Sequence, residues 1–537
     1  MMQEKNPHSS QMKRKRLTLI ILLVVLATVA VGLYYLISPY VRRGIRRRVI
    51  VFYFQNVSED NSLDPLTYGI TLEIKDDLRA VKRAVTGRWS VAKKYLALKT
   101  IDEADTRFAS VGMDVARALG CQYAVVGEVN RIGNEIEIKA TTVNAHTGKR
   151  KIHKIARGQE EEIFRLIDDI SVQVARSVGG YLTKTEEAEI RRPPTRSLEA
   201  FKHFCNGRIA SINRRYSDAI RAYLQAITLD RDYLRAYVNL GYTYCYIGDY
   251  QRAVKAAQNA AEKHPEDTLG WSTLGYIHNE YEKYSEAEKA YLRGLAINPE
   301  DTTILNNIGV NYRDKYRNKK DKGNLDKAIE YFDRGLALDP YDSYLNFNKG
   351  GALYDKGLHE EAAKYYKAAY DMLPNYENAH NMRGCCLRKL RKYDEALKEF
   401  EEELKYYPDD VQAQYNIGLT YENKGDLVKA EKNCRKAINM NPYYYRAYYA
   451  LGGLLNDQGK RAEAVEVYKQ GIAIEPDYHH FYWALGASLM ELGRLEESKK
   501  CWETYLKYDS TSEQAHWARV RLKQINAALA GKPPKTP

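Results

Sequence analysis

The sequence lacks the short motifs that mark most catalytic, cofactor and metal sites. It contains neither a G-x-x-x-x-G-K-[ST] nor a G-x-G-x-x-G loop, so no phosphate-binding cradle is predicted. His359-Glu360 begins like a zinc-protease motif, but Ala363 stands where the second histidine is needed. The stretches 270–272 and 486–488 lack the closing glycine of a nucleophile elbow. We therefore expect no enzyme, and neither a catalytic residue, a cofactor, a metal nor a small-molecule substrate.

Paired cysteines are also missing. The chain has seven cysteines, an odd number, and no C-x-x-C pair. Such a pattern indicates neither a disulfide framework nor a zinc site.

The net positive charge is small outside the N-terminal segment. The net charge is +13, but residues 1–48 hold ten basic residues against one acid, Glu4. That segment accounts for +9, and only +4 remains for the rest of the chain. A nearly neutral body is not the footprint of a protein that binds a phosphate backbone, so no nucleic-acid partner is expected.

Phenylalanine and tryptophan are few, whereas tyrosine is abundant. The sequence has 45 Tyr against 10 Phe and 5 Trp. Because tyrosine joins an apolar ring to a hydroxyl group, it suits faces that are half packed and half wet, as binding surfaces are.

The one long hydrophobic run spans residues 17–37, LTLIILLVVLATVAVGLYYLI, which is 21 residues without a charge. At about 1.5 Å per residue it would cross the ~30 Å hydrocarbon layer. A cleaved signal peptide is the alternative, but the run exceeds a typical h-region and no A-x-A site follows it. We predict a basic tail at 1–16 and a single transmembrane helix at 17–37.

The side of the membrane is set by opposing signals. Five basic residues precede the run and five follow it shortly after, so the positive-inside rule gives a tie. A short basic tail before a first hydrophobic segment usually stays in the cytoplasm, which would place the body of the protein outside. Unpaired cysteines favour the opposite arrangement, with the body in the cytoplasm. The expected arrangement is a single-pass membrane protein with its body on the extracytoplasmic side.

Residues 46–182 predict a small α/β domain with about four strands. We expect strands at 49–54, 121–130, 135–144 and 149–157, with a tight hairpin turn at 131–134. Helices are expected at 65–80, 113–119 and 160–182, the last with a continuous apolar face. Residues 183–196 are charged, contain Pro193-Pro194 and lack periodicity, so they read as a linker.

Four stretches of this domain carry a family resemblance. Residues 49–58 (VIVFYFQNVS), 68–71 (YGIT), 120–129 (GCQYAVVGEV) and 143–148 (VNAHTG) resemble the TolB-like N-terminal domain family in order and spacing. The resemblance implies a small α/β module of bacterial multidomain proteins, with no catalytic residues to transfer. The basic stretch 149–154 departs from the aromatic-rich strand of that family, and we interpret it as a solvated edge strand protected by charge.

Glycines recur at a nearly constant interval in the C-terminal two-thirds of the chain. They stand at positions 207, 241, 275, 309, 350, 384, 418, 452 and 486, 34 residues apart except for one interval of 41. A small residue lies twelve residues after each glycine, displaced by seven in the fourth unit. Large residues such as Tyr223 and Phe332 come next, and proline ends seven of the nine units. A unit of this kind folds as a helix–turn–helix hairpin that cannot bury its faces alone, so neighbouring units stack into a superhelix.

This pattern resembles the tetratricopeptide repeat family over residues 197–510, which makes nine repeats. A capping helix is expected at 511–527, with Trp517 and Leu522 covering the last repeat, and a disordered tail at 528–537. The fourth unit carries seven extra residues around 315–322. We expect them to add a turn to each helix of that hairpin, and a basic contact site is the alternative.

The resemblance also implies that the first helix of each hairpin lines a concave groove. Inward positions would lie about −6, −3, +1, +4 and +5 residues from each glycine. Aromatic faces together with Asn and Arg donors suit an extended peptide, although single tyrosines could instead pack between repeats. The candidates are Arg235, Tyr242, Tyr276, Asn279, Asn306, Arg313, Tyr354, Asn381, Arg388, Tyr415, Tyr449, Asn456 and Trp483.

The sequence as a whole predicts a mainly α protein, in which a superhelix of tetratricopeptide hairpins follows a small α/β domain and one transmembrane helix. The expected function is a membrane-anchored scaffold or adaptor. It would bind protein or peptide partners in the groove and recruit or assemble a complex at a bacterial cell or inner membrane. The alternative is a sensory or regulatory subunit whose α/β domain binds a small ligand or an envelope component.

Overall fold

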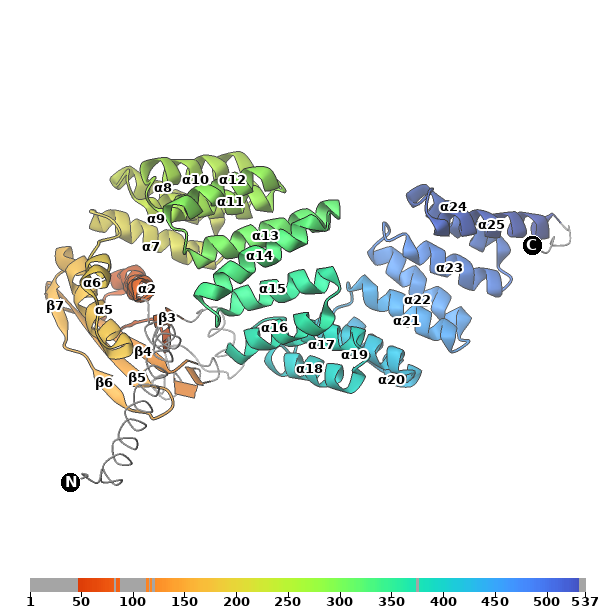
Figure 1. Ribbon diagram of the computed structural model, residues 1–537, viewed down its shortest axis with the longest axis horizontal. Coiled ribbons are helices and arrows are strands. Elements are labelled where there is room, and N and C mark those ends of the chain that lie inside the picture. The colour runs from red at the N-terminus through yellow and green to blue at the C-terminus, as the bar shows by residue number, and fades with distance from the viewer. Residues whose placement is uncertain are drawn as a thin grey trace, which may run out of the picture. The chain divides into compact units, whose positions relative to one another are not determined.

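The computed structural model describes residues 47–81, 84–86, 113–114, 116–117, 121–372 and 376–530. The predicted basic tail at 1–16 and transmembrane helix at 17–37 lie outside these residues, as does most of the predicted C-terminal tail. No helix among the described residues is both long and apolar enough to cross a membrane. The chain forms two compact units, residues 1–265 and 266–537, which we describe separately (Figure 1).

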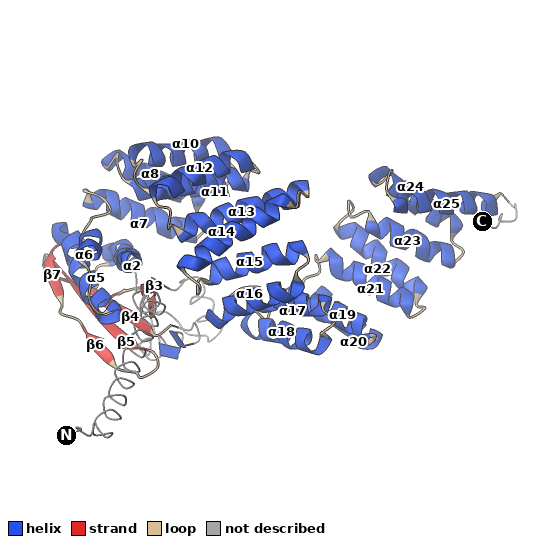
Figure 2. Cartoon of the chain, in the orientation of Figure 1, coloured by secondary structure: helices blue, strands red, loops and turns tan. Residues whose placement is uncertain are grey.

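Unit 1 begins with a mixed β-sheet (Figure 2). Strand β1 lies between β3 and β4 and runs parallel to both, and β5 and β6 follow β4 in antiparallel fashion. Two short strands lie outside this order, with β2 beside β4 and β7 beside β5. The described strands are β1 (Arg47–Val51), β2 (Gln55–Asn56), β3 (Ala84–Thr86), β4 (Tyr123–Ile132), β5 (Glu135–Asn144), β6 (Arg150–Ile152) and β7 (Ala156–Gln159).

The β4–β5 hairpin is the longest pairing of the sheet. It runs in register from Tyr123 opposite Asn144 to Ile132 opposite Glu135. The predicted hairpin is therefore confirmed, with a turn of two residues in which Gly133 has a φ of 62°. The single strand expected at 149–157 is instead two short strands separated by residues 153–155, although the backbone N–H of His153 still donates to the carbonyl oxygen of Ala140 on β5 at 3.0 Å.

Helices α2 (Asp64–Ala80) and α5 (Ile163–Gly179) contact each other and the same face of the sheet. Short 3-10 turns, η1 (Asn61–Leu63) and η2 (Glu160–Glu162), precede them. The predicted apolar faces are confirmed. The side chains at helical spacing on the two helices are at most 1% exposed, namely Leu66, Ile70, Ile74, Leu78, Ile163, Leu166, Ile167, Ile170, Val174 and Val178.

Part of the segment interpreted as a linker is a helix. Residues Lys184–Ile190 form α6, which begins with a reciprocal capping box between Thr183 and Glu186. The expectation of an irregular linker is wrong at these seven residues. The T-x-x-E start signal outweighs the lack of apolar periodicity in so short a helix.

Nine helical hairpins follow between Leu198 and Tyr508 in the described residues, each made of a first and a second helix. Unit 1 holds α7 (Leu198–Ile212), α8 (Tyr216–Leu229), α9 (Leu234–Tyr246) and α10 (Tyr250–Lys263). Unit 2 holds α11 (Thr268–Glu280), α12 (Tyr284–Ile297), α13 (Thr302–Lys319), α14 (Gly323–Leu338), α15 (Ser343–Lys356), α16 (His359–Met372), α17 (Ala379–Lys389), α18 (Tyr393–Tyr406), α19 (Val411–Lys424), α20 (Leu427–Met440), α21 (Tyr445–Asp457), α22 (Arg461–Ile474), α23 (His480–Glu491), α24 (Leu495–Tyr508) and the final helix α25 (Glu513–Leu529).

Repeat glycines on the first helices lie against large side chains of the second helices. A Cβ atom added at Gly275 would come within 2.5 Å of the Tyr291 ring, and one at Gly384 within 2.7 Å of Phe400. The predicted hairpin fillers are confirmed, since Tyr223, Tyr291, Phe332, Tyr366, Phe400, Tyr468 and Trp502 are all at most 2% exposed. Glycine is required here because the two helices approach too closely for any side chain.

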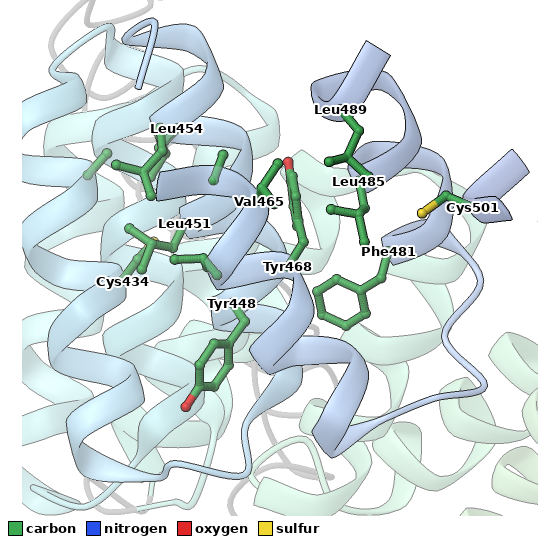
Figure 3. Close-up of a cluster of buried hydrophobic side chains, with 14 residues drawn as sticks. Cys434, Tyr448, Leu451, Leu454, Val465, Tyr468, Phe481, Leu485, Leu489 and Cys501 are labelled. Atoms are coloured by element: carbon green, nitrogen blue, oxygen red, sulfur yellow. The ribbon is translucent and has the colours of Figure 1, made fainter. Parts of the chain in front are cut away.

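The cores of neighbouring hairpins are continuous. Figure 3 shows Tyr468 of α22 between Leu451 of α21 and the apolar side chains Phe481 and Leu485 of α23. These hairpins of unit 2 therefore bury one face internally and another against the next hairpin, as stacked repeats do.

Two local expectations have different outcomes. The seven extra residues of the fourth hairpin lengthen its helices, so α13 has 18 residues and α14 has 16, against 14 in α15 and α16. The predicted cover of the last repeat is only partly right. Leu522 packs against the cluster of Trp502 and Tyr505, whereas Trp517 is 51% exposed and the buried contacts come from Ala518 and Ile525.

Candidate functional site

The predicted inward positions lie on a surface that we call the first-helix face, meaning the side chains at −6, −3, +1, +4 and +5 from each repeat glycine. Twelve of the thirteen candidate residues are half-buried, and Asn381 is buried. Within unit 2, α13 contacts both α11 and α15, and α19 contacts both α17 and α21. The first helices of these neighbouring hairpins therefore lie next to one another, and their exposed side chains form one continuous row.

The first-helix face of unit 1 is partly covered by the α/β domain. Nη1 of Arg235 on α9 donates to Oε1 of Glu73 on α2 at 2.5 Å and lies 3.4 Å from Oδ2 of Asp76. Phe201 and Cys205 of α7 close directly over Gly69 of α2, where a Cβ would not fit. Arg235 was predicted as a ligand donor, but it joins the domain to the second hairpin instead.

Burial raises the pKa of three carboxyl groups near this junction, Glu73, Asp77 and Asp168. Burial raises the pKa of Glu73 to about 7, because the cost of burying the anion outweighs the attraction of Arg235. Burial also raises the pKa of Asp168 to about 6 and that of Asp77 well above its usual range. Ser171 on α5 donates to Asp77 at 2.5 Å and so ties this group of acids to the helix layer.

The predicted asparagines of unit 2 bridge neighbouring first helices. Each takes part in a side-chain hydrogen bond to the first helix of the next hairpin, so the bonds form a ladder that fixes the spacing of the hairpins. The four bonds are Asn279 Nδ2 to Asp314 Oδ2 (3.2 Å), Asn348 Nδ2 to Asn306 Oδ1 (2.9 Å), Asn416 Nδ2 to Asn381 Oδ1 (2.8 Å) and Asn456 Nδ2 to Ser488 Oγ (2.8 Å). The partners Asp314, Asn348, Asn416 and Ser488 were not predicted, because the positional rule treats each repeat by itself and does not consider pairs between repeats.

Aromatic residues at the −3 position pack against the following hairpin. In each case the partner is a tyrosine eight residues before the next repeat glycine, and the ring centroids are 4.8 to 5.6 Å apart. The pairs are Phe204 with Tyr233, Phe347 with Tyr376, Tyr415 with Tyr444, and Tyr449 with Tyr478. Tyr415 and Tyr449 therefore bury much of their ring surface between repeats. This is the alternative to ligand binding that the sequence left open for single tyrosines.

Where the −3 residue is not aromatic, an aspartate replaces the partner tyrosine. Asn306 is followed by Asp342 and Asn381 by Asp410, and each aspartate caps the helix that begins after it. At this position, a tyrosine packs against a ring of the preceding hairpin, whereas an aspartate caps the helix that follows it. This coupled pattern is visible in the sequence and could have identified the packing tyrosines.

The remaining aromatic candidates are divided between packing and the surface. Trp483 meets Trp502 at 4.8 Å within its own hairpin, and Tyr354 lies 5.0 Å from the ring of His359. Tyr242 and Tyr276 are half-buried on α9 and α11.

The +4 position retains unused hydrogen-bonding capacity. Four of the predicted residues there keep one buried polar side-chain atom without a hydrogen-bond partner among the described residues. These atoms are Oδ1 of Asn279, Nε of Arg313, Nε of Arg388 and Oδ1 of Asn456. A buried polar atom without a partner costs about 1–3 kcal/mol, which a ligand that supplies the partner would recover.

Comparison with family models settles the nature of the hairpins. One model of the tetratricopeptide repeat matches residues 242–302, 317–377 and 381–445, and another matches residues 452–493. The helical hairpins within these matched residues are tetratricopeptide repeats. This fold is typically a non-enzymatic scaffold that binds protein or peptide partners, and the matching models indicate no catalytic family. No three His, Cys, Asp or Glu side chains within the described ranges are grouped so as to hold a metal ion.

Solved structures similar to this chain are also tetratricopeptide proteins. One from Parabacteroides merdae ATCC 43184 shares 17% identity and a TM-score of 0.37, over 55% of this chain and 98% of that one. Yeast Tom70 shares 15% identity and a TM-score of 0.36, over 62% and 96% of the two chains. YrrB, described as a tetratricopeptide protein with an unusual peptide-binding site, shares 24% identity and a TM-score of 0.31, over 37% and 98%. No curated protein matches the chain.

Proposed function

We propose that this protein is a membrane-anchored tetratricopeptide scaffold that binds an extended segment of a partner protein along the first-helix face of unit 2. The observation that carries the proposal is the row of unpartnered buried atoms on Asn279, Arg313, Arg388 and Asn456. Asn279, Arg388 and Asn456 each hold one hydrogen bond to a neighbouring repeat and leave another atom free, so they are fixed in position before a ligand arrives. A peptide backbone supplies both N–H donors and C=O acceptors, so it can satisfy a row that contains amide oxygens and guanidinium nitrogens.

A photo-crosslinking residue at Tyr354 tests this placement. Tyr354 is half-buried on the first helix α15, whereas the control position Val428 is 78% exposed on the second helix α20. We expect partner crosslinks in cells from position 354 and none from position 428. The same crosslinks should disappear when Asn279, Arg388 and Asn456 are changed together to alanine. Crosslinks that arise equally from both positions, or that survive this triple change, would contradict the proposal.

We also propose that residues 17–37 hold the scaffold in a bacterial membrane with its body on the extracytoplasmic side. The support is the uncharged run of 21 residues and its distance from the folded domain, since β1 begins at Arg47. Ten residues of chain span at most about 35 Å, so the α/β domain would stay close to the bilayer. Protease added to intact spheroplasts should digest the repeats, and protection of the repeats would instead place the body in the cytoplasm.

A sensory or regulatory subunit remains the second candidate, because α2 of the α/β domain is joined to the first hairpins. A ligand that altered the position of α2 would act on Arg235 through Glu73 and Asp76. The test is a screen of small molecules for a rise in the unfolding temperature of the full chain. A hit whose effect vanishes in an Arg235→Gln variant would favour this candidate, and stabilisation that is equal in both proteins would not.

A further inference from the structure

Arg313 is set apart from the other predicted arginines by its lack of partners. Arg235 is paired with Glu73, and Arg388 donates to Asn423 at 3.4 Å. One turn beyond Arg313 on the same helix, Arg317 donates to Asp355 at 2.8 Å. Arg313 itself makes neither a hydrogen bond nor an ion pair with any residue that the structure describes, and its Nε is buried.

The nearby carboxylates are already engaged. Asp314 accepts the hydrogen bond from Asn279 on α11, and Asp355 accepts the one from Arg317. Burial, together with the neighbouring charge of Arg317, lowers the pKa of Arg313, which is the opposite of what a bound anion would do. Asp314 and Asp355 attract the Arg313 charge, but burial and the repulsion of Arg317 outweigh them.

The space around the guanidinium is kept open by a glycine. Gly351 on α15 is buried beneath Arg313, and a Cβ at this position would overlap Nη1. The same Cβ would lie 3.6 Å from the hydroxyl oxygen of Tyr366, so the hydroxyl and the guanidinium both border the space above Gly351. Gly351 follows the repeat glycine Gly350 and is not needed for the hairpin contact, which Gly350 makes with Tyr366.

A half-buried guanidinium without an anion is unfavourable, because it has lost water without gaining a counter-charge. The group that best restores the balance is a carboxylate, whose two oxygens match the planar fork of an arginine. Neighbouring hairpins in a helical stack lie about 8–10 Å apart, and an extended chain rises about 3.3 Å per residue. About three ligand residues would therefore pass each hairpin.

We propose that Arg313 binds a carboxylate of an extended peptide, and that Oδ1 of Asn279, one hairpin earlier, accepts a backbone N–H about three residues away in the same peptide. The inference rests on the proposed function and names the chemistry of its ligand. The carboxylate belongs either to an aspartate or glutamate side chain or to the C-terminus of the partner. The ligand is thus acidic at the position that passes between α13 and α15.

The test uses the purified full chain in detergent and two random peptide arrays, one with blocked C-termini and one with free C-termini. We expect bound peptides from the blocked array to share an Asp or Glu at one position, and a terminal carboxylate alone to be selected if the C-terminus is the ligand. Arg313→Gln should weaken binding of a selected peptide at least tenfold. Replacing the acidic residue of that peptide with Asn should cost as much against the native chain and almost nothing against Arg313→Gln.

Two further variants keep the result interpretable. Lys315→Gln removes the same charge from the same helix at a side chain that faces Glu288 and Tyr312, and it should bind as the native chain does. Gly351→Ala keeps the charge but displaces the guanidinium, so it should lose the acidic preference. Arg313→Gln should be at least as resistant to unfolding as the native chain, because no ion pair is lost.

The outcomes separate the inference from the function on which it rests. Peptides that bind this face without any acidic preference, or an acidic preference that Arg313→Gln retains, would overturn the inference alone. An absence of selected peptides, or binding that is unchanged by alanine at Asn279 and Asn456, would overturn the proposed function as well.

Discussion

Two adjacent glycines of α21, Gly452 and Gly453, allow a sharp test of how the hairpins are packed. A Cβ at Gly452 would lie 2.5 Å from Cζ and 2.7 Å from Cδ1 of Tyr468, whose ring is 2% exposed and cannot move away. A Cβ at Gly453 would have nothing within 4 Å. The same substitution to alanine should therefore have opposite effects at neighbouring positions.

The expected magnitudes follow from these distances. Gly452→Ala forces a methyl group about 1 Å inside normal contact with a fixed ring, which costs about 1–3 kcal/mol. Gly453→Ala meets no atom and gains helix propensity, so it should stabilise by about 0.5–1 kcal/mol. Tyr468→Ala alone leaves a cavity and should cost about 3–5 kcal/mol. In the double variant the new methyl enters the vacated space, so the combined cost should fall short of the sum by about 1–3 kcal/mol.

Hydrogen exchange on the backbone amides of α21 and α22 is the suitable assay, because long repeat arrays unfold locally rather than in one step. Amides of α7 and α8 serve as an internal control and should not change. Equal effects of the two alanines, or full additivity of Gly452→Ala with Tyr468→Ala, would refute the view that contact with Tyr468 demands the glycine.

Two further predictions concern the junction with the α/β domain and the packing between repeats. The pKa of Glu73 is raised to about 7 from 4.5, so the folded state holds this proton more tightly than the unfolded state does. The contribution of Glu73 to stability is therefore greatest below pH 4.5 and is lost as pH rises through 7. The loss for Glu73 alone is about 3 kcal/mol, and Glu73→Gln should flatten the decline, as measured by urea unfolding with hydrogen exchange on α2; an unchanged slope would contradict the assignment. Tyr415→Asn should lower the hydrogen-exchange protection of α19 and α21, because the Tyr444 ring loses its partner. Adding Tyr444→Asp should restore part of this protection through a new helix cap. Protection that is lower still in the double variant would contradict the idea that an asparagine–aspartate pair can replace an aromatic–tyrosine pair.

The hairpins were predictable because their determinants recur at a fixed spacing. Gly275 and Tyr291 lie 16 residues apart within one hairpin, so glycine and ring meet through local helix geometry alone. The apolar face of α5 was equally accessible, since burial at helical spacing needs no knowledge of the partner. Short elements were the weak point. The charged helix α6 has no apolar periodicity, and Trp517 of α25 was assigned by its size rather than by its side of the helix.

The sequence predicted where the candidate functional residues lie, but not which of them already have a hydrogen-bond or ion-pair partner. Arg235 and Arg313 both satisfied the positional rule, yet Arg235 is neutralised by Glu73, which is 162 residues away in the chain. Only the packing of α2 against the first hairpins brings that partner into place, and no periodicity in the repeats encodes it. The same limit applies to Asn279, for which position predicts an inward side chain and cannot predict that Nδ2 is bonded while Oδ1 is free.

The sequence does predict whether a side chain has a partner where residues in two neighbouring repeats vary together. The tyrosines at 233, 376, 444 and 478 occur where the preceding hairpin has an aromatic −3 residue, and aspartates at 342 and 410 occur where it has asparagine. Each choice excludes the other, because one position cannot both cap a helix and cover a ring. An aromatic −3 residue is thereby removed from the ligand-facing set by its neighbour. The +4 residues Asn279, Arg313, Arg388 and Asn456 meet no such exclusion, and each keeps a free atom. For this reason the +4 row, rather than the tyrosines, is the part of the first-helix face from which we expect partner selection to arise.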